Sequence, residues 1–393
     1  MKYKIGIVYS GTLQARCGGP STYLYNLKKG LRLIKSHKCE FYCFEINNFF
    51  SNNFLEYIFK KSLKCFEVLY IVNDVLKYLF SKKNYTDAIN KKILHFHSSN
   101  DLFYFKKLYR YKGNAVLTMH APEPYADEVV NFLKQYYGTE DNFILIRKYL
   151  SYVQKIACKN ADAFIFPTKE SEEVYKKFDF YRPVYNKSIV KYLITGSDRK
   201  IVTKSKEEIR FSLGIKEDGF VVSYLGRHIQ IKGYDMLINS FNKIKENNIF
   251  VVCAGQVNPK LKYPKNDKWI ELGWINNTCE ILKMSDVLVL PNKSTYFDLV
   301  AIEALEQGCI IVASNTGGNI TLGEKCSGVI LFDIKNQDDF INKICYIKNL
   351  SLKEKTDLKT ENYKFYKENC VLDKFASNYI NTINEICNEI ERK

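Results

Sequence analysis

Short apolar runs that are typical of buried strands alternate with helical segments from one end of the chain to the other. In the first half these runs are KIGIVYS, EFYCFEIN, ILHFHS, AVLTMHA and AFIFPT, and in the second half they are GFVVSYLG, IFVVCAG, WIELGWI, VLVLPN, IIVAS and GVILFD. Strands that alternate with helices form parallel sheets whose two faces are both covered. The pattern therefore predicts an α/β chain with two doubly wound parallel sheets, one for each series of strands.

The length of the chain also favours two domains, because it has 393 residues and single cores stop growing at about 250–300 residues. We place an N-terminal domain at residues 1–190 and a C-terminal domain at residues 191–373. Residues 374–393 are expected to form a last helix, which could pack on either domain, including back on the N-terminal one. Further helices are expected over residues 131–160 and from starts near Tyr234, Thr278, Leu299 and Gln337.

The net charge of +16 is concentrated in the first part of the chain. Residues 1–112 carry 20 Lys and Arg against 7 Asp and Glu, and this excess indicates an anionic partner for one surface. Residues 54–83 and 103–112 mix large apolar side chains with lysines, a pattern that favours docking on anionic lipid head groups. We therefore expect an anionic membrane surface as a partner of residues 54–112, although the same helices could bury their apolar faces and merely expose the lysines. No recognised nucleic-acid-binding motif accompanies the charge, so nucleic acid is not an expected partner.

The cysteines and the apolar runs bear on the compartment. The twelve cysteines include no CxxC pair, and reduced thiols are the default for a cytoplasmic protein. The first apolar run is too short for a signal peptide and ends in a turn, and no run of about 18 apolar residues occurs that could cross a membrane. We expect a cytoplasmic protein that could also lie peripherally at the inner face of the plasma membrane.

Ligands of open α/β sheets bind beyond the carboxyl ends of the strands, so the residues that follow each strand are the candidates. After the first strand, Gly18 and Gly19 precede a helix start, where backbone N–H groups can meet an anion; a plain turn would also explain two glycines. His120 ends another strand and could donate to a sugar hydroxyl or act near a leaving group, or be a structural histidine. His95 and His97 alternate along one strand, so we expect them on opposite faces, and no further spaced ligands accompany them for zinc.

The second half places cations after its first strand. Arg227 follows that strand directly, and Lys232 stands five residues later. Two cations near a strand end and a helix start suit a pyrophosphate, although two solvated loop charges are the alternative reading of the same residues.

A helix start follows the strand VLVLPN. Its first backbone N–H groups, free to meet a phosphate, belong to Asp298, Leu299 and Val300. Glu303, within the first turns, could reach a ribose diol with both carboxylate oxygens.

Together these residues resemble the GT4 family of retaining glycosyltransferases, also called glycosyl transferases group 1, which has the GT-B fold. The matching pieces occur in family order over roughly residues 4–320: CGGPSTYL, HFHS, LTMHAP, TGSD, LGRHIQIKGYDMLINSF, CAGQ, LGWI and SDVLVLPNKSTYFDLVAIEALEQGCIIVASNTGG. The last piece is the most specific, and the GR–KG–D pattern is next. The resemblance implies two Rossmann-like domains that face each other across a cleft, with the donor held mainly by the C-terminal domain and the acceptor by the N-terminal domain.

The resemblance also implies roles for single residues. Arg227 and Lys232 would hold the donor diphosphate, His120 would lie near the donor sugar, and the glycines at 18–19 would lie beside the phosphate. Glu303 matches the second acid of the family's Glu–seven residues–Glu motif, which is expected to bind ribose hydroxyls. The implied donor is a UDP- or GDP-linked sugar and the implied acceptor is a glycan or a lipid-linked molecule, with no metal and no cofactor. Retention of the anomeric configuration would follow from same-face attack, in which electrostatic clamping matters more than a protein nucleophile.

The chain departs from this pattern at Thr295, where the family has its first acid. Thr295 can still donate a hydrogen bond to a sugar hydroxyl, but it carries no charge. Asp298 replaces the family's usual glycine three residues later and could supply the missing carboxylate, at the cost of placing a negative charge beside a phosphate.

Two kinds of function are consistent with these residues. The first is an active retaining hexosyltransferase that builds a surface polysaccharide, a lipopolysaccharide or another glycoconjugate. The alternative is a catalytically silent GT-B subunit that binds and stabilises a partner transferase, which the threonine at position 295 favours. A GT-B epimerase or phosphorylase is a third option, and the absence of an evident pyridoxal-phosphate lysine motif disfavours the phosphorylase.

Overall fold

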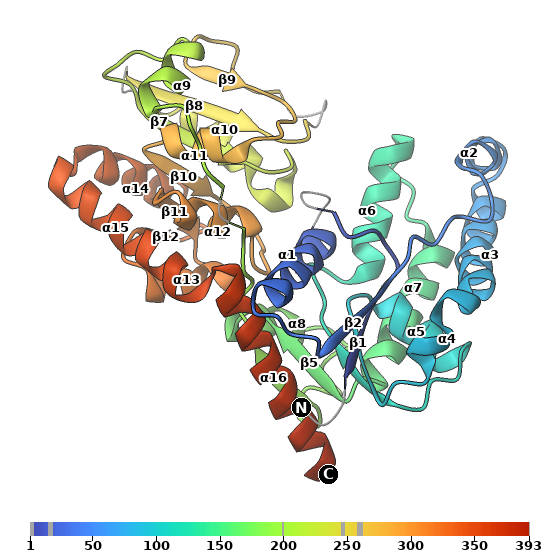
Figure 1. Ribbon diagram of the computed structural model, residues 1–393. Helices are drawn as coiled ribbons and strands as arrows, with labels where there is room; N and C mark the ends of the chain where they lie inside the picture. Colours follow the sequence, from blue (N-terminus) through green and yellow to red (C-terminus); the bar gives the residue numbers. More distant parts are fainter. Residues whose placement is uncertain (1–3, 15–18, 199, 245–247, 258–261, 393) are drawn as a thin grey trace. The chain divides into compact units, whose positions relative to one another are not determined.

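The computed structural model describes residues 4–14, 19–198, 200–244, 248–257 and 262–392. The chain divides into two compact units, shown in Figure 1. The first unit comprises Met1–Phe166, Glu172–Leu193 and Ala376–Lys393, and the second comprises Pro167–Ser171 and Ile194–Phe375. Most of the last helix is therefore grouped with the N-terminal part of the chain, from which it is far removed in sequence.

The first unit is built on a six-stranded, all-parallel sheet with the order β2-β1-β3-β4-β5-β6. Its strands are β1 (Ile5–Tyr9), β2 (Cys39–Cys43), β3 (Ile93–Phe96), β4 (Asn114–Leu117), β5 (Ala163–Phe166) and β6 (Ile189–Tyr192). Its helices are α1 (Gly19–Leu33), α2 (Asn52–Lys61), α3 (Leu63–Ser81), α4 (Thr86–Ile89), α5 (Ser99–Lys107), α6 (Tyr125–Tyr137), α7 (Ile144–Lys159), most of α8 (Lys169–Lys176) and most of α16 (Leu372–Arg392), with a 3-10 turn η1 (Lys82–Tyr85).

The second unit has a second six-stranded, all-parallel sheet, with the order β12-β11-β10-β7-β8-β9. Its strands are β7 (Phe220–Leu225), β8 (Ile249–Ala254), β9 (Trp269–Glu271), β10 (Val287–Leu290), β11 (Ile310–Ser314) and β12 (Val329–Phe332). Its helices are α9 (Lys206–Ser212), α10 (Tyr234–Phe241), α11 (Thr278–Met284), α12 (Leu299–Glu306), α13 (Gly318–Lys325), α14 (Gln337–Asn349) and α15 (Leu352–Asn369), with a 3-10 turn η2 (Gln230–Lys232).

Alternate residues of the central strands form the two cores of this second unit. Val221 and Leu288 belong to the apolar cluster on one face of the sheet, whereas Val222 and Val289 belong to the cluster on the other face. Successive side chains of a strand point to opposite faces, and both faces are covered by helices, so the strands must be apolar throughout. This requirement explains why runs such as VLVL and IIVAS mark the strands so clearly, and the predicted pair of doubly wound parallel sheets is confirmed.

The helical stretch expected over residues 131–160 is formed by two helices, α6 and α7. α6 ends at Tyr137 and is followed by Gly138, which has the left-handed φ of 64° of a C-terminal cap and donates its N–H to the carbonyl of Lys134. Glycine takes this conformation at no steric cost, and α7 begins only at Ile144. The helix starts expected near Tyr234, Thr278, Leu299 and Gln337 are confirmed.

The expectation that His95 and His97 point to opposite faces is wrong. β3 ends at Phe96, so His97 lies beyond the strand and the alternation no longer applies to it. The two rings lie side by side, with their centroids 4.2 Å apart.

Candidate functional site

The strand order of the second unit reverses between β7 and β10, which are neighbours in the sheet but not in the sequence. Ligands of doubly wound sheets bind beyond the carboxyl ends of the strands at such a switch point. The segment after β7 carries Arg227 and Lys232, and the segment after β10 leads to α12. A backbone hydrogen bond from the N–H of Lys293 to the carbonyl of Ile231, of 2.9 Å, joins the two segments.

Gly233 lets these two segments approach each other. Its φ is +70°, and a Cβ atom built on it would lie 1.7 Å from the carbonyl oxygen of Pro291. Any other residue would therefore push the Lys232 segment away from the end of β10.

Lys232 is held by a carboxylate of the neighbouring segment. Its Nζ lies 2.6 Å from Oδ1 of Asp298, and the amide of Asn292 donates to Oδ2 of the same carboxylate at 2.6 Å. Burial alone would raise the pKa of Asp298, but the Lys232 ammonium and the donated hydrogen bonds outweigh it and lower the pKa. Asp298 is thus ionised at neutral pH, and although it precedes α12, its side chain pairs with Lys232 and does not cap the helix.

Thr295 lies close to Asp298 in the interior of the unit. Its side chain is fully buried, and its hydroxyl has no hydrogen-bond partner among the described residues, although it contributes to the lowered pKa of Asp298. The backbone here is fixed by close packing, because a Cβ atom on Gly317 (φ +47°) would lie 1.9 Å from the carbonyl oxygen of Thr295. The structure thus brings together Lys232, Asp298 and Thr295.

Both carboxylate oxygens of Glu303 have protein partners. Oε1 forms an ion pair with the Nζ of Lys200, and Oε2 accepts a hydrogen bond of 2.8 Å from the hydroxyl of Thr278. Leu299 and Val300 lie in the first turn of the same helix, where backbone N–H groups have no intrahelical acceptor. One turn beyond Glu303, burial raises the pKa of Glu306 to about 7.

Arg227 stands apart from these contacts. It is exposed, and among the described residues no ion pair involves its guanidinium. Its carbonyl accepts a hydrogen bond of 2.8 Å from the hydroxyl of Tyr224, which fixes the backbone and leaves the side chain in solvent.

Several polar residues around this site were not predicted from the sequence. Lys200 and Thr278 lie outside the recognised pieces, whereas Asn292 lies within the last of them. The pairing of Lys200 with Glu303 joins positions 103 residues apart. For Asn292, its place directly after VLVLP was the available signal, because the strand-end rule applies to it as well.

The first unit carries the remaining predicted residues. Its sheet order also switches, between β1 and β3, and His120 follows the neighbouring strand β4. His120 Nε2 lies 2.9 Å from Nδ1 of His97, and burial lowers the pKa of His120 to about 3, so the ring is neutral at physiological pH. Gly19 begins α1, and among the described residues no atom outside its chain neighbours and its own helix lies within 4 Å of where its Cβ would be. Gly18 lies outside the described residues.

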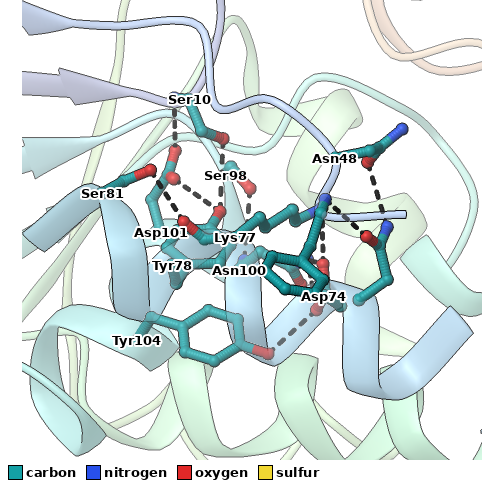
Figure 2. A network of polar contacts seen from close by, with 12 residues as sticks. Ser10, Asn48, Asp74, Lys77, Tyr78, Ser81, Ser98, Asn100, Asp101 and Tyr104 are labelled. Carbon is teal, nitrogen blue, oxygen red and sulfur yellow. Dashed lines mark hydrogen bonds and ion pairs between the residues drawn. The ribbon is translucent and has the colours of Figure 1, made fainter. Parts of the chain in front are cut away.

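A buried polar network, drawn in Figure 2, supports the strand ends of this unit. Asp101 accepts hydrogen bonds from the backbone N–H of Ser10 at 3.0 Å and from the hydroxyl of Tyr78 at 2.8 Å, which ties the segment after β1 to α3 and α5. Asp74 on α3 pairs with Lys77 at 2.6 Å and accepts from the hydroxyl of Tyr104. Buried carboxylates that are satisfied in this way hold the surrounding elements in one arrangement.

Comparison with known proteins supports a family assignment. Residues 205–365 match the model of the family described as "Glycosyl transferases group 1". A UDP-Gal:alpha-D-GlcNAc-diphosphoundecaprenol alpha-1,3-galactosyltransferase of Escherichia coli is 32% identical over 151 residues, which cover 35% of this chain and 38% of that protein. The matches cover only about a third to a half of the length of the first curated relatives, at 38%, 53% and 34%.

Solved structures match the fold over nearly the whole chain. Sucrose-phosphate synthase from Thermosynechococcus elongatus has a TM-score of 0.65 at 16% identity and covers 99% of this chain and 100% of that one. HepE of Anabaena, in complex with UDP and glucose, has a TM-score of 0.65 at 14% identity, with 97% of this chain and 99% of that one covered. The chain thus has the GT-B fold of these structures, and its second unit matches the group 1 glycosyltransferase model.

Proposed function

We propose that this protein is a retaining hexosyltransferase that moves a sugar from a UDP- or GDP-linked donor to a glycan or lipid-linked acceptor, in the synthesis of a surface polysaccharide, a lipopolysaccharide or another glycoconjugate. The second unit would hold the donor and the first unit the acceptor. The nucleotide sugar is a substrate, and neither a cofactor nor a metal ion is part of the proposal. The names of two similar proteins support the donor class, because one is called a UDP-Gal-dependent transferase acting on a diphosphoundecaprenol-linked sugar and another contains UDP and glucose.

The observation that carries the proposal is the convergence of charge at the β7–β10 switch point. Lys232 and Glu303 lie on segments that meet there, beside the first turn of α12, whose N–H groups and positive dipole end favour a phosphate. Arg227, which is exposed in the segment after β7, would bind the diphosphate as a second cation. Glu303, held by Lys200 and Thr278, would accept the ribose hydroxyls with the lone pairs that remain on its oxygens.

In the proposed reaction the leaving diphosphate takes the proton of the attacking acceptor hydroxyl on the same face of the sugar. The cations Arg227 and Lys232 would stabilise the charge that develops on the leaving group, which is the kind of preorganised electrostatic effect that lowers barriers most. Because burial keeps the ring of His120 neutral, this side chain would act as a hydrogen-bonding group near the donor sugar and not as a cation.

One observation favours the alternative of a catalytically silent subunit. Asp298 already neutralises Lys232, and the Thr295 side chain is fully buried and brings no charge. A site with this arrangement could retain the fold and lose turnover, while the protein stabilises a partner transferase.

Ligand-dependent stability and turnover separate these two functions. The purified chain is heated with UDP, GDP, ADP and their sugars, because a ligand that binds the folded state raises the unfolding temperature by mass action. Transfer or hydrolysis of the stabilising donor is then compared for the wild type, for Lys232→Ala and for Lys243→Ala, which removes an exposed lysine of the same unit. We expect turnover to fall in Lys232→Ala and not in Lys243→Ala. Nucleotide binding without turnover would favour the silent subunit. The absence of both binding and turnover across the panel would contradict both donor-site proposals.

The acceptor side of the proposal includes a membrane surface, and helix α3 supports it. One face of α3 exposes Val68, Val72, Val75 and Leu79, whose spacing of four, three and four residues places them in one stripe, and each is 38–47% exposed. No helix among the described residues has the length and apolar character to cross a membrane. The stripe would therefore lie on a bilayer surface and not within it.

The opposite face of α3 is buried and carries the polar side chains Glu67, Asn73 and Asp74 beside the aromatic residues Phe66 and Tyr78. Glu67 accepts hydrogen bonds from the backbone N–H groups of Leu145 and Ile146 at the start of α7, at 2.7 and 3.3 Å. Asn73 accepts from the N–H groups of Phe49 and Phe50 at 2.7 and 2.9 Å. These hydrogen bonds fix which face of α3 points inward, so they also hold the apolar stripe on the outer face of the helix.

The charges at both ends of the stripe favour anionic lipid as its partner. Exposed lysines lie before the stripe and after it, namely Lys60, Lys61, Lys64, Lys82 and Lys83. Each lysine near an anionic surface contributes about 1 kcal/mol, and the attraction falls off within a Debye length of about 10 Å at 0.1 M salt. We therefore place the protein at the cytoplasmic face of a membrane, bound through residues 54–112.

Sedimentation with liposomes tests this surface. We expect the wild type to bind vesicles of anionic phospholipid at low salt and to be released by salt, and the double variant Val72→Glu/Leu79→Glu to lose binding. Phe211→Glu, at an exposed apolar residue of the second unit, is the matched control. A wild type that stays in the supernatant contradicts the proposal, and a dimer that the double variant dissolves would assign the stripe to a second copy of the chain.

A further inference from the structure

Three histidine rings of the first unit form a continuous row at the carboxyl ends of β3 and β4. The centroids of His95 and His97 are 4.2 Å apart, and those of His97 and His120 are 5.2 Å apart. His95 and His97 are buried, whereas His120 is partly exposed. His120, the residue proposed to lie near the donor sugar, is thus followed in this row by His97 and His95, to which the proposed function gives no role.

His95 is satisfied without help from the other two rings. The hydroxyl of Thr118 donates to the carbonyl of Ile165 at 3.2 Å, so it must accept from Nε2 of His95, which lies 2.9 Å away. Nδ1 of His95 then accepts from the hydroxyl of Tyr379 at 2.9 Å. The hydrogen of this ring is therefore fixed on Nε2.

Among the described residues, the ring of His97 has one hydrogen bond, and it is to His120. The two nitrogens, Nδ1 of His97 and Nε2 of His120, lie 2.9 Å apart. The other nitrogen of His97, Nε2, is buried and has no hydrogen-bond partner among the described residues. Burial lowers the pKa of both rings, so a single hydrogen is shared between two neutral side chains.

The hydrogen can be placed in two ways, and they leave different groups unpaired. If His120 donated from Nε2, the hydrogen of His97 would be on its own Nε2, a buried N–H with no acceptor. If His97 donates from Nδ1, only a bare ring nitrogen is left unpaired. Orphaned buried N–H groups are rarer in proteins than acceptors with unused capacity, so the second arrangement is the favoured one.

We propose that His97 is a positioning residue whose Nδ1–H donates to Nε2 of His120 and so keeps the hydrogen of the His120 ring on Nδ1. His120 then presents an N–H donor, suited to a sugar hydroxyl or a phosphate oxygen, and no ring nitrogen that could take a proton from the acceptor. The use of this donor rests on the proposed function, whereas the tautomer itself does not.

Nitrogen NMR of the full chain labelled with ¹⁵N-histidine tests the tautomer directly, because protonated and bare ring nitrogens differ widely in chemical shift. The His120 signals are assigned by their loss in His120→Gln. We expect a protonated Nδ1 and a bare Nε2 in the wild type and in His97→Asn, whose side-chain amide can donate in place of the ring. In His97→Leu, which has no donor, we expect a mixture of tautomers. A wild-type His120 that carries its hydrogen on Nε2 overturns the proposal, and so does an unchanged His120 spectrum in His97→Leu.

Turnover kinetics separate a positioning role of His97 from a merely structural one, because only a positioning role predicts a fall in kcat at nearly constant KM that His97→Asn recovers. We expect kcat of His97→Leu to fall about tenfold or more, as for lost supporting partners in other sites, with the donor KM within about threefold. His97→Asn should recover most of that loss. If the expected tautomer is seen but no donor is turned over by the wild type, the proposed function fails and this inference stands. If donor is turned over but His120 has the other tautomer, the proposed function stands and this inference fails. Should His97→Leu fail to fold, the wild-type and His97→Asn spectra still decide the tautomer.

Discussion

Replacing Asp298 by asparagine should lower the stability of the unliganded protein and tighten the binding of nucleotide diphosphates. A phosphate oxygen bound by Lys232 would lie about 2.7–2.9 Å from its Nζ, and Oδ1 of Asp298 lies 2.6 Å from the same Nζ. The carboxylate oxygen and the phosphate oxygen would then be at most about 5.5 Å apart. At that separation, repulsion between the carboxylate and one phosphate charge amounts to about 1–3 kcal/mol for effective dielectric constants between about 80 and 20. Its removal should therefore strengthen diphosphate binding at least about fivefold.

The unliganded protein should respond in the opposite direction. Side-chain exposures of 23% and 15% for Lys232 and Asp298 indicate a partly buried pair, and loss of a hydrogen bond to a charged group costs about 1.5–3 kcal/mol. A domain of about 150–250 residues loses about 2–4 °C for each kcal/mol. Differential scanning fluorimetry of Asp298→Asn without ligand should therefore show a lower unfolding temperature, and the same assay with UDP or GDP a larger ligand-induced increase than in the wild type.

The pH dependence of this effect follows from the lowered pKa of Asp298. A carboxyl group whose pKa is lower in the folded than in the unfolded state stabilises the protein above the unfolded value of about 4 and loses this contribution as the pH falls through the folded value. The difference between wild type and variant should thus be full at neutral pH and vanish in acid. The double variant Lys232→Ala/Asp298→Asn should lose the tighter binding. Two results would refute Lys232 as the diphosphate ligand: tighter binding that remains in the double variant, or a ligand-induced increase in the unfolding temperature of Asp298→Asn no larger than that of the wild type.

Three further changes test the local geometry. Gly233→Ala, whose Cβ would lie 1.7 Å from the carbonyl oxygen of Pro291, should lower the unfolding temperature far more than Gly214→Ala, which has a similar φ of +69° but meets no atom within 4 Å; equal losses would contradict the close approach. Glu303→Gln should weaken nucleoside diphosphate binding about tenfold in calorimetry, as loss of a charged hydrogen-bond acceptor does, and an unchanged affinity would remove the ribose role. Glu306→Gln should raise the unfolding temperature at pH 8 but not at pH 4, because the pKa of Glu306 is raised to about 7 and its ionisation destabilises the fold as the pH rises from about 4 to 7.

The sequence allowed the sheets to be predicted because the strands are buried on both faces. Runs such as VLVL and IIVAS have no polar member before their last residue, and their ends therefore locate the helix starts after them. β6 was missed for the opposite reason. It lies at the edge of its sheet, its run Ile189–Tyr192 includes a lysine, and only one of its residues is buried.

The residues of the candidate site could be predicted singly but not as pairs. Lys232 and Glu303 are identified by their place after a strand, which is a local property. Their partners are not local, because Lys232 meets Asp298 66 residues later and Glu303 meets Lys200 103 residues earlier. Such contacts depend on the strand order of the sheet, and hydrophobic periodicity contains no information about that order. The error at His97 has a different cause, because the alternation rule was applied one residue beyond the end of the strand.

These partners change what the predicted ligands can do. Lys232 is neutralised by Asp298, and Glu303 by Lys200, so the two charges that would hold a diphosphate and a ribose already balance within the second unit. A nucleotide that binds must exchange these ion pairs for its own contacts, and the net gain is smaller than for a free lysine and a free carboxylate. Asp298 pairs with Lys232 in the unliganded chain. In the proposed function it would hold the charge of Lys232 until an anion competes for it, and would not stand in for the acid that the family has at position 295. In the proposed function the residue at position 298 would set the affinity for nucleotide, and substitutions at this position should distinguish an active enzyme from a silent subunit.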